Sequence, residues 1–100
     1  MSPGIDKLAT CREQIDALDV KIVDLLNERT EIVHEIGRIK RQFAMPIYEP
    51  KREDQVFANV TGHNPGPMTA EALKRIFERI IDEMRTIQQE RLANPTTPSD

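Results

Sequence analysis

Two cationic side chains stand where the spacing of their neighbours predicts the apolar face of a helix. Arg29 lies between Leu25 and Ile32 in alternating steps of four and three residues, and a guanidinium group is almost never buried without a partner. Lys40 follows eleven residues later, and eleven helical steps of about 100° return to within roughly 20° of the same direction. Two cations roughly 16 Å apart on one helical face predict either internal ion pairs or a bound anion.

Arg12 and Gln88 are two further polar candidates. Arg12 precedes Arg29 by seventeen residues, or roughly 25 Å along a helix, so these two groups of one chain cannot share a small ligand. If two copies of the helix pack antiparallel, Arg12 of one copy can approach Arg29 and Lys40 of the other. Gln88 comes four residues after Met84, at the border of a later apolar pattern, which predicts a neutral donor directed into a helix bundle.

Simpler structural explanations exist for most of these positions. Arg12 could pair with Asp16 one helical turn away, and Lys40 could be a solvated cation at the end of a helix. Arg52 and Glu53 could be surface charges. Taken singly, these explanations are favoured, and only the arginine within the apolar stripe calls for a ligand or a buried partner.

The helix that must position these residues is predicted from about Ile5 to Phe43. A heptad-like stripe continues along its whole length. The stripe consists of Leu8, Cys11, Ile15, Leu18, Ile22, Leu25, Arg29, Ile32, Ile36, Ile39 and Phe43. Pro46 ends the helix, because proline lacks a backbone N–H and disfavours helical geometry in the residue before it.

Two shorter helices are predicted after this one. The first covers about Pro50 to Val60, and the Gly- and Pro-containing segment Thr61–Pro67 is predicted to be a loop. Thr69 can then cap a helix from about Ala70 to Leu92. The apolar face of that helix is formed by Leu73, Ile76, Phe77, Ile80, Ile81, Met84 and Ile87.

The length of the first helix predicts a homodimer. About 38 residues at ~1.5 Å each span roughly 57 Å, whereas a compact chain of this size has a radius of gyration of about 13 Å. Two short helices cannot cover both ends of the stripe, so a second, antiparallel copy is expected to do so. A plain parallel coiled coil is the alternative, but the amphipathic third helix needs a groove, which favours a mixed bundle.

Composition limits the class of protein. The chain of 100 residues is assigned to one domain over residues 1–92, with a tail at 93–100 that is predicted to be disordered. A hydrophobic content of 38% without tryptophan is typical of an all-α fold with an aliphatic core. The net charge of −3 argues against nucleic acid or an anionic membrane as partner. The single cysteine, Cys11, and the lack of a long apolar run predict a soluble, cytoplasmic protein.

Several segments, taken together, resemble the AroQ-type chorismate mutases. They are Arg12–Asp19, Leu25–Arg29, Ile36–Lys40, Pro46–Glu53, Ile80–Met84 and Gln88-Gln89. The resemblance implies an all-α, intertwined homodimer with two identical sites, in which chorismate rearranges to prephenate for phenylalanine and tyrosine synthesis. Such a unimolecular rearrangement requires no nucleophile, metal or cofactor, so catalysis is expected to come from conformation and charge.

By the same resemblance, four side chains bind the carboxylates and the ether oxygen of the substrate. Arg12 from the second copy and Arg29 would hold the two carboxylates of chorismate. Lys40 and Gln88 would donate hydrogen bonds to the ether oxygen, where negative charge grows as the C–O bond breaks.

The resemblance assigns four more residues to the pocket. Glu53 would accept a hydrogen bond from the ring hydroxyl, the backbone near Glu49 would assist, and Arg52 would support the pocket. Met84 stands where some members carry a small polar residue that donates to a carboxylate, so the resemblance implies that this donor is missing here.

Two other functions fit the same pattern. An isochorismate pyruvate-lyase shares the fold and acts on a similar dianion, although Glu53 and Gln88 together favour the mutase. A non-catalytic helical module that regulates or docks onto another shikimate-pathway enzyme is the second alternative. Association with DAHP synthase is a further expectation, and the sequence is also compatible with a domain fused to another enzyme of the pathway.

Overall fold

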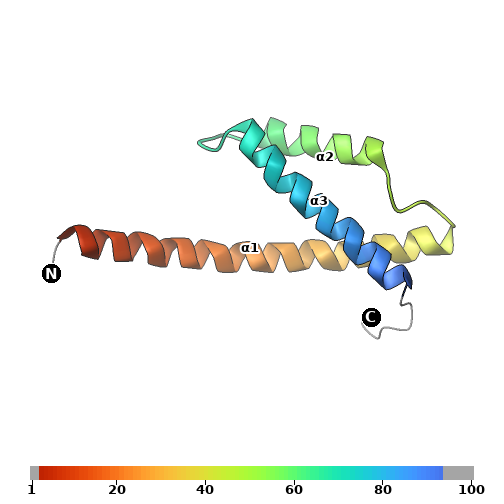
Figure 1. Cartoon of the computed structure of the whole chain (residues 1–100), viewed down its shortest axis with the longest axis horizontal. Helices are drawn as coiled ribbons and strands as arrows, with labels where there is room; N and C mark the ends of the chain where they lie inside the picture. The colour runs from red at the N-terminus through yellow and green to blue at the C-terminus, as the bar shows by residue number, and fades with distance from the viewer. Residues whose placement is uncertain (1–2, 94–100) are drawn as a thin grey trace. The chain divides into compact units, whose positions relative to one another are not determined.

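Residues 3–93 of the chain, which the computed structural model describes, form three α-helices (Figure 1). These are α1 (Pro3–Gln42), α2 (Pro50–His63) and α3 (Ala70–Ala93). An all-α fold with three helices and a long first helix is therefore confirmed. None of the helices within the described residues is both long and apolar enough to cross a membrane. The chain divides into two compact units, at the boundary between Ile32 and Val33.

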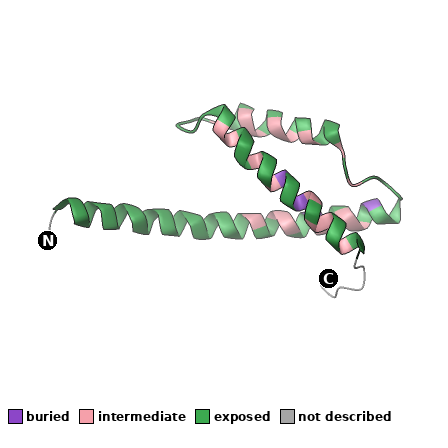
Figure 2. Ribbon diagram, in the orientation of Figure 1, coloured by how far each residue is buried: buried purple, intermediate pink, exposed green. Residues whose placement is uncertain are grey.

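The N-terminal unit, as far as it is described, consists of the first thirty residues of α1. Every side chain from residue 3 to residue 25 is exposed, as Figure 2 shows for this part of the helix. The apolar stripe is no exception, since Leu18 is 55%, Ile22 52% and Leu25 63% exposed. A stripe of this length in contact with water costs free energy that a second apolar surface would recover.

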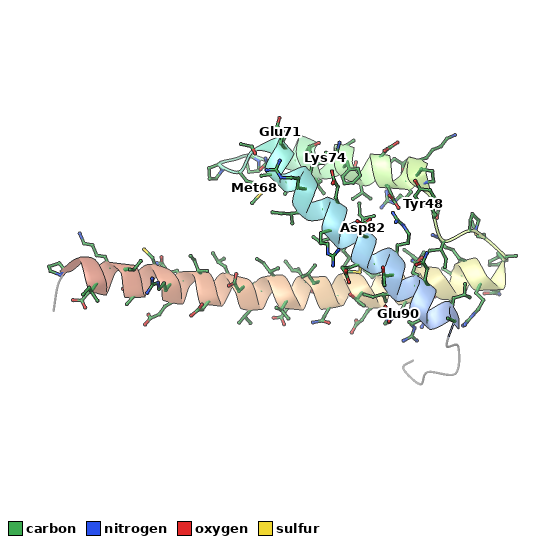
Figure 3. All side chains as sticks on the ribbon, in the orientation of Figure 1. Tyr48, Met68, Glu71, Lys74, Asp82 and Glu90 are labelled. Atoms are coloured by element: carbon green, nitrogen blue, oxygen red, sulfur yellow. The ribbon has the colours of Figure 1, made fainter. Side chains whose placement is uncertain are left out.

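The second unit contains the end of α1 together with α2 and α3. Its core is small and includes Val33 from α1 and Ile81 and Met84 from α3. α2 and α3 contact each other and are joined by a short loop (Figure 1). Lys74, labelled on α3 in Figure 3, places its Nζ 5.5 Å from the centre of the Phe57 ring on α2.

The C-terminus of α1 closes in a Schellman motif. The Met45 N–H donates to the Lys40 carbonyl at 2.7 Å, and the Ala44 N–H donates to the Arg41 carbonyl at 3.3 Å. Ala44 has a φ of 53°, in the left-handed region where glycine is usual. The helix therefore ends four residues before Pro46, which prevents its continuation but does not itself form the cap.

We expect Ala44→Gly to stabilise the protein. A side chain in the left-handed region costs about 1–2 kcal/mol, and the greater freedom of glycine in the unfolded chain offsets part of the gain. The free energy of unfolding should rise by about 0.5–1 kcal/mol, measured by urea titration. Ala58→Gly, in the middle of α2, is the control and should lower it by a similar amount. Destabilisation by Ala44→Gly would contradict the cap geometry.

The connection between α2 and α3 differs in part from the prediction. The prediction that residues 61–63 belong to the loop is wrong, because α2 continues to His63. The Thr61 hydroxyl donates to the Phe57 carbonyl at 2.7 Å, so this residue is accommodated within the helix. The loop begins at Asn64, whose side-chain amide donates to the Met68 carbonyl at 2.7 Å and whose Oδ1 accepts from the Gly66 N–H at 3.0 Å.

The start of α3 agrees with the prediction, and its end lies one residue beyond the predicted one. Thr69 is confirmed as N-cap, because its Oγ1 accepts a hydrogen bond of 3.1 Å from the Ala72 N–H. Ala93, predicted to belong to a disordered tail, is the last residue of α3. The rest of that predicted tail, 94–100, lies outside the described residues.

Candidate active site

Lys40 is a buried cation in the last turn of α1. It is 8% exposed, and its Nζ donates to the Ile47 carbonyl at 2.9 Å and forms an ion pair with Glu49 Oε1 at 2.8 Å. The alternative of a solvated cation at a helix end is therefore wrong. An ammonium group has three donors, so these two partners leave one donor for a ligand while holding the group in place.

The linker and the start of α2 position the two partners of Lys40. Pro50 occupies the first turn of α2, where its missing N–H and restricted φ suit a helix start. Glu49 is the N-cap residue, and its carbonyl accepts from the Glu53 N–H at 3.0 Å. Glu49 and Glu53 thus lie at the positive end of the α2 dipole, which stabilises both carboxylates.

Gln88 of α3 contacts the same segment of α1. Its Nε2 donates to the Val33 carbonyl at 3.5 Å, a long and therefore weak hydrogen bond. Its Cγ lies 3.8 Å from the position that a Cβ would occupy at Gly37. Because residues 33, 37 and 40 share one face of α1, the Gln88 amide and the Lys40 ammonium belong to the same side of this segment. That these two donors act on one substrate atom stays a prediction.

Glu53 is fixed by an arginine from α3. Arg85 Nη2 donates to Glu53 Oε2 at 2.5 Å, and both side chains are partly buried. The Arg85 guanidinium lies 4.9 Å from the centre of the Tyr48 ring and 3.6 Å from Asp82 Oδ1. Tyr48 and Asp82, labelled in Figure 3, come from the linker and from α3. The hydrogen bond to Glu53 is the main cause of a raised pKa of Arg85, which keeps the guanidinium charged.

The other predicted site residues are distributed over the chain. Arg12 and Arg29 belong to the N-terminal unit, in which Arg12 is exposed and Arg29 partly buried. Met84 is buried in the second unit at 7% exposure. Its apolar side chain stands where the resemblance implies a missing donor. Arg52 is exposed on α2 and its Nη1 lies 3.5 Å from Gln55 Oε1, as in the surface-charge alternative. Glu53, by contrast, does not fit that alternative.

Three residues of this cluster, namely Arg85, Tyr48 and Asp82, were not predicted from the sequence. A signal was present, since Arg85 lies four residues after Ile81 and three before Gln88, on the border of the apolar face of α3. A cation at that border could have been questioned in the same way as Arg29. Nothing in the spacing, however, indicated that its partner would be Glu53.

The charges of the cluster nearly cancel. Lys40 and Arg85 contribute two positive charges, whereas Glu49, Glu53 and Asp82 contribute three negative ones. A dianionic ligand at this site therefore needs further cations. Among residues 3–93, no group of three or more His, Cys, Asp or Glu side chains is placed to hold a metal ion.

The family model for chorismate mutase type II matches residues 11–89 of this chain. The chain belongs to this family. Among curated relatives, the bifunctional chorismate mutase/prephenate dehydratase of Neisseria gonorrhoeae is 36% identical over 90 residues, which cover 89% of this chain and 24% of that protein. The chain thus spans about a quarter of the length of the first curated relatives that it matches. It also matches the chorismate mutase of Methanocaldococcus jannaschii at 30% identity over 89 residues, 88% of this chain and 90% of that one.

A solved chorismate mutase structure resembles this chain over most of its length. The chorismate mutase of Helicobacter pylori, crystallised in complex with prephenate, has a TM-score of 0.81 and 32% sequence identity. The likeness covers 88% of this chain and 96% of that one. The prediction of an AroQ-type chorismate mutase domain is therefore confirmed at the level of family and fold.

Proposed function

We propose that this chain is a chorismate mutase, which converts chorismate to prephenate by a Claisen rearrangement in phenylalanine and tyrosine biosynthesis. The observation that carries the proposal is the buried ammonium of Lys40, held by Ile47 and Glu49 on the face of α1 that Gln88 contacts. Two donors of this kind suit an ether oxygen that gains negative charge as its C–O bond breaks, and they bind the transition state more tightly than the substrate.

The active form is a homodimer. The exposed stripe of α1 supports this, because a second copy of the same helix offers a complementary apolar surface. Each site would then take Arg29 from one chain and Arg12 from the other, and these two guanidinium groups would bind the substrate carboxylates. They would also supply the positive charge that the near-neutral cluster around Lys40 lacks. Gripping both carboxylates selects the compact, reactive conformer of a flexible dianion.

The remaining predicted residues complete the pocket. Glu53 accepts a hydrogen bond from the ring hydroxyl, the backbone at Glu49 assists, and Arg52 stabilises the pocket from α2. Met84 supplies an apolar contact in place of a donor. A cytoplasmic location and an association with DAHP synthase are further expectations of this proposal.

The function is tested by following the loss of chorismate absorbance and identifying the product. We expect prephenate in the assay and a dimer by sedimentation at assay concentrations. Release of pyruvate from isochorismate without prephenate formation would favour the lyase. A chain inactive on both chorismate and isochorismate would favour the non-catalytic regulatory module. A monomer that retained full turnover would contradict a site shared between two chains.

A further inference from the structure

Within residues 3–93, the Glu53 carboxylate is held through one of its two oxygens. Arg85 Nη2 contacts Oε2 at 2.5 Å, and a carboxylate has acceptor capacity on both of its oxygens. The ion pair therefore leaves Oε1 as an acceptor in a defined orientation. Because Glu53 lies in the first turn of α2 and Arg85 in the second half of α3, the contact also ties these two helices together at the site.

Arg85 is itself held on several sides. Its guanidinium lies 4.9 Å from the Tyr48 ring centre, and its Nη1 lies 3.6 Å from Asp82 Oδ1. Its Nε is buried and has no hydrogen-bond partner among the described residues. Leaving a buried donor unsatisfied costs free energy, so this arrangement is maintained by the contacts of the other two nitrogens and of the ring. Such an arginine is a rigid support for its carboxylate.

We propose that Arg85 is a positioning residue for Glu53, which it orients so that the carboxylate accepts the hydrogen bond of the substrate ring hydroxyl. The inference rests on the proposed function and adds to it a determinant of substrate choice. Arg85 does not contact the reacting atoms. It makes the enzyme selective for a cyclohexadiene dicarboxylate that carries a hydroxyl on the ring. A correctly placed acceptor forms its hydrogen bond only with a substrate that has this donor.

The test compares two substrates in the chain of 100 residues. These are chorismate and an analogue in which hydrogen replaces the ring hydroxyl. Arg85→Gln should lower kcat/KM for chorismate by about tenfold to hundredfold, the range that one hydrogen bond to a charged group represents. The same variant should turn over the analogue at nearly the wild-type rate. An equal loss on both substrates would overturn the proposal, since it would mean that Arg85 binds a carboxylate or merely supports the fold.

A double-mutant comparison isolates the Arg85–Glu53 pair. Glu53→Gln should cause a similar loss on chorismate, and Glu53→Gln combined with Arg85→Gln should lose little more than either alone. Arg85→Lys should recover part of the activity, because the observed contact uses a single nitrogen, Nη2, that an ammonium can replace. Multiplied losses in the double variant, or no recovery with lysine, would overturn the positioning role.

Arg79 on the same helix provides the matched control. It forms an ion pair with Glu83 Oε1 at 2.7 Å on an exposed face of α3, so Arg79→Gln should change neither substrate's kinetics. Circular dichroism melting of every variant separates lost folding from lost orientation, and Arg85→Lys decides the question if Arg85→Gln does not fold. Normal wild-type turnover with an unaffected Arg85→Gln would reject this inference alone, whereas a wild-type chain inactive on chorismate would reject the proposed function.

Discussion

Replacing Lys40 with alanine is expected to lower kcat for chorismate by about 10²–10³-fold or more, the effect of removing one preorganised donor from developing negative charge. The chain should stay folded and dimeric. Glu49 is partly solvent-exposed and can be hydrated after the change, whereas the Ile47 carbonyl loses its ammonium donor. The free energy of unfolding should therefore fall by about 1–3 kcal/mol. Stopped-flow or steady-state absorbance at saturating chorismate gives kcat, and sedimentation reports the dimer.

Two control variants separate the ammonium from its surroundings. Glu49→Gln removes the ion-pair partner and keeps Lys40, so it should cost far less turnover than Lys40→Ala. Lys51→Ala removes an exposed cation from the first turn of α2 and should be silent. Near-normal kcat in Lys40→Ala would refute the role given to this residue.

Mixing two inactive variants is expected to restore activity. In a dimer of Arg12→Ala and Lys40→Ala chains, one site combines the intact Lys40 of one chain with the intact Arg12 of the other, and the second site lacks both. If the chains exchange freely, about half of the dimers are mixed, so the mixture should reach about a quarter of wild-type activity. The measurement is turnover before and after joint refolding of the two purified variants.

If each site were made within a single chain, the mixture of Arg12→Ala and Lys40→Ala chains would stay inactive, because every chain lacks one of the two residues. Arg12→Ala mixed with Arg12→Ala, Lys40→Ala double-variant chains is the matched control, because no combination of these chains assembles a complete site. It should stay inactive after the same refolding step. If the first mixture also stayed inactive although native mass spectrometry showed mixed dimers, Arg12 would not act across the dimer.

The helices follow from local chemistry and could be predicted from the sequence. The spacing of the apolar residues places α1 and α3 within one to two residues of their observed ends, and the Thr69 hydroxyl marks the start of α3. The end of α2 was missed, because Thr61 bonds back to its own helix instead of beginning the loop. The cap of α1 at Ala44 was missed as well, since alanine carries no signal for a left-handed backbone.

The candidate site could be predicted only in part. Lys40 and Gln88 stood out because each breaks or borders an apolar pattern that a helix must bury. Whether Lys40 was a solvated or a buried cation could not be decided, because its partners lie in the linker and not on its own helix. Arg52 and Glu53 are neighbours in the sequence, yet one is exposed and the other is held by α3.

The helical segments and their apolar faces follow from the amino-acid sequence alone, because those properties depend on residues a few positions apart. Which charged side chains meet depends on how the helices pack against each other. Arg85 and Glu53 are separated by 32 residues, and their contact exists because α2 folds back against α3. An ion pair of this kind depends on where two helices approach each other, and this approach is set by the packing of whole faces rather than by any local pattern.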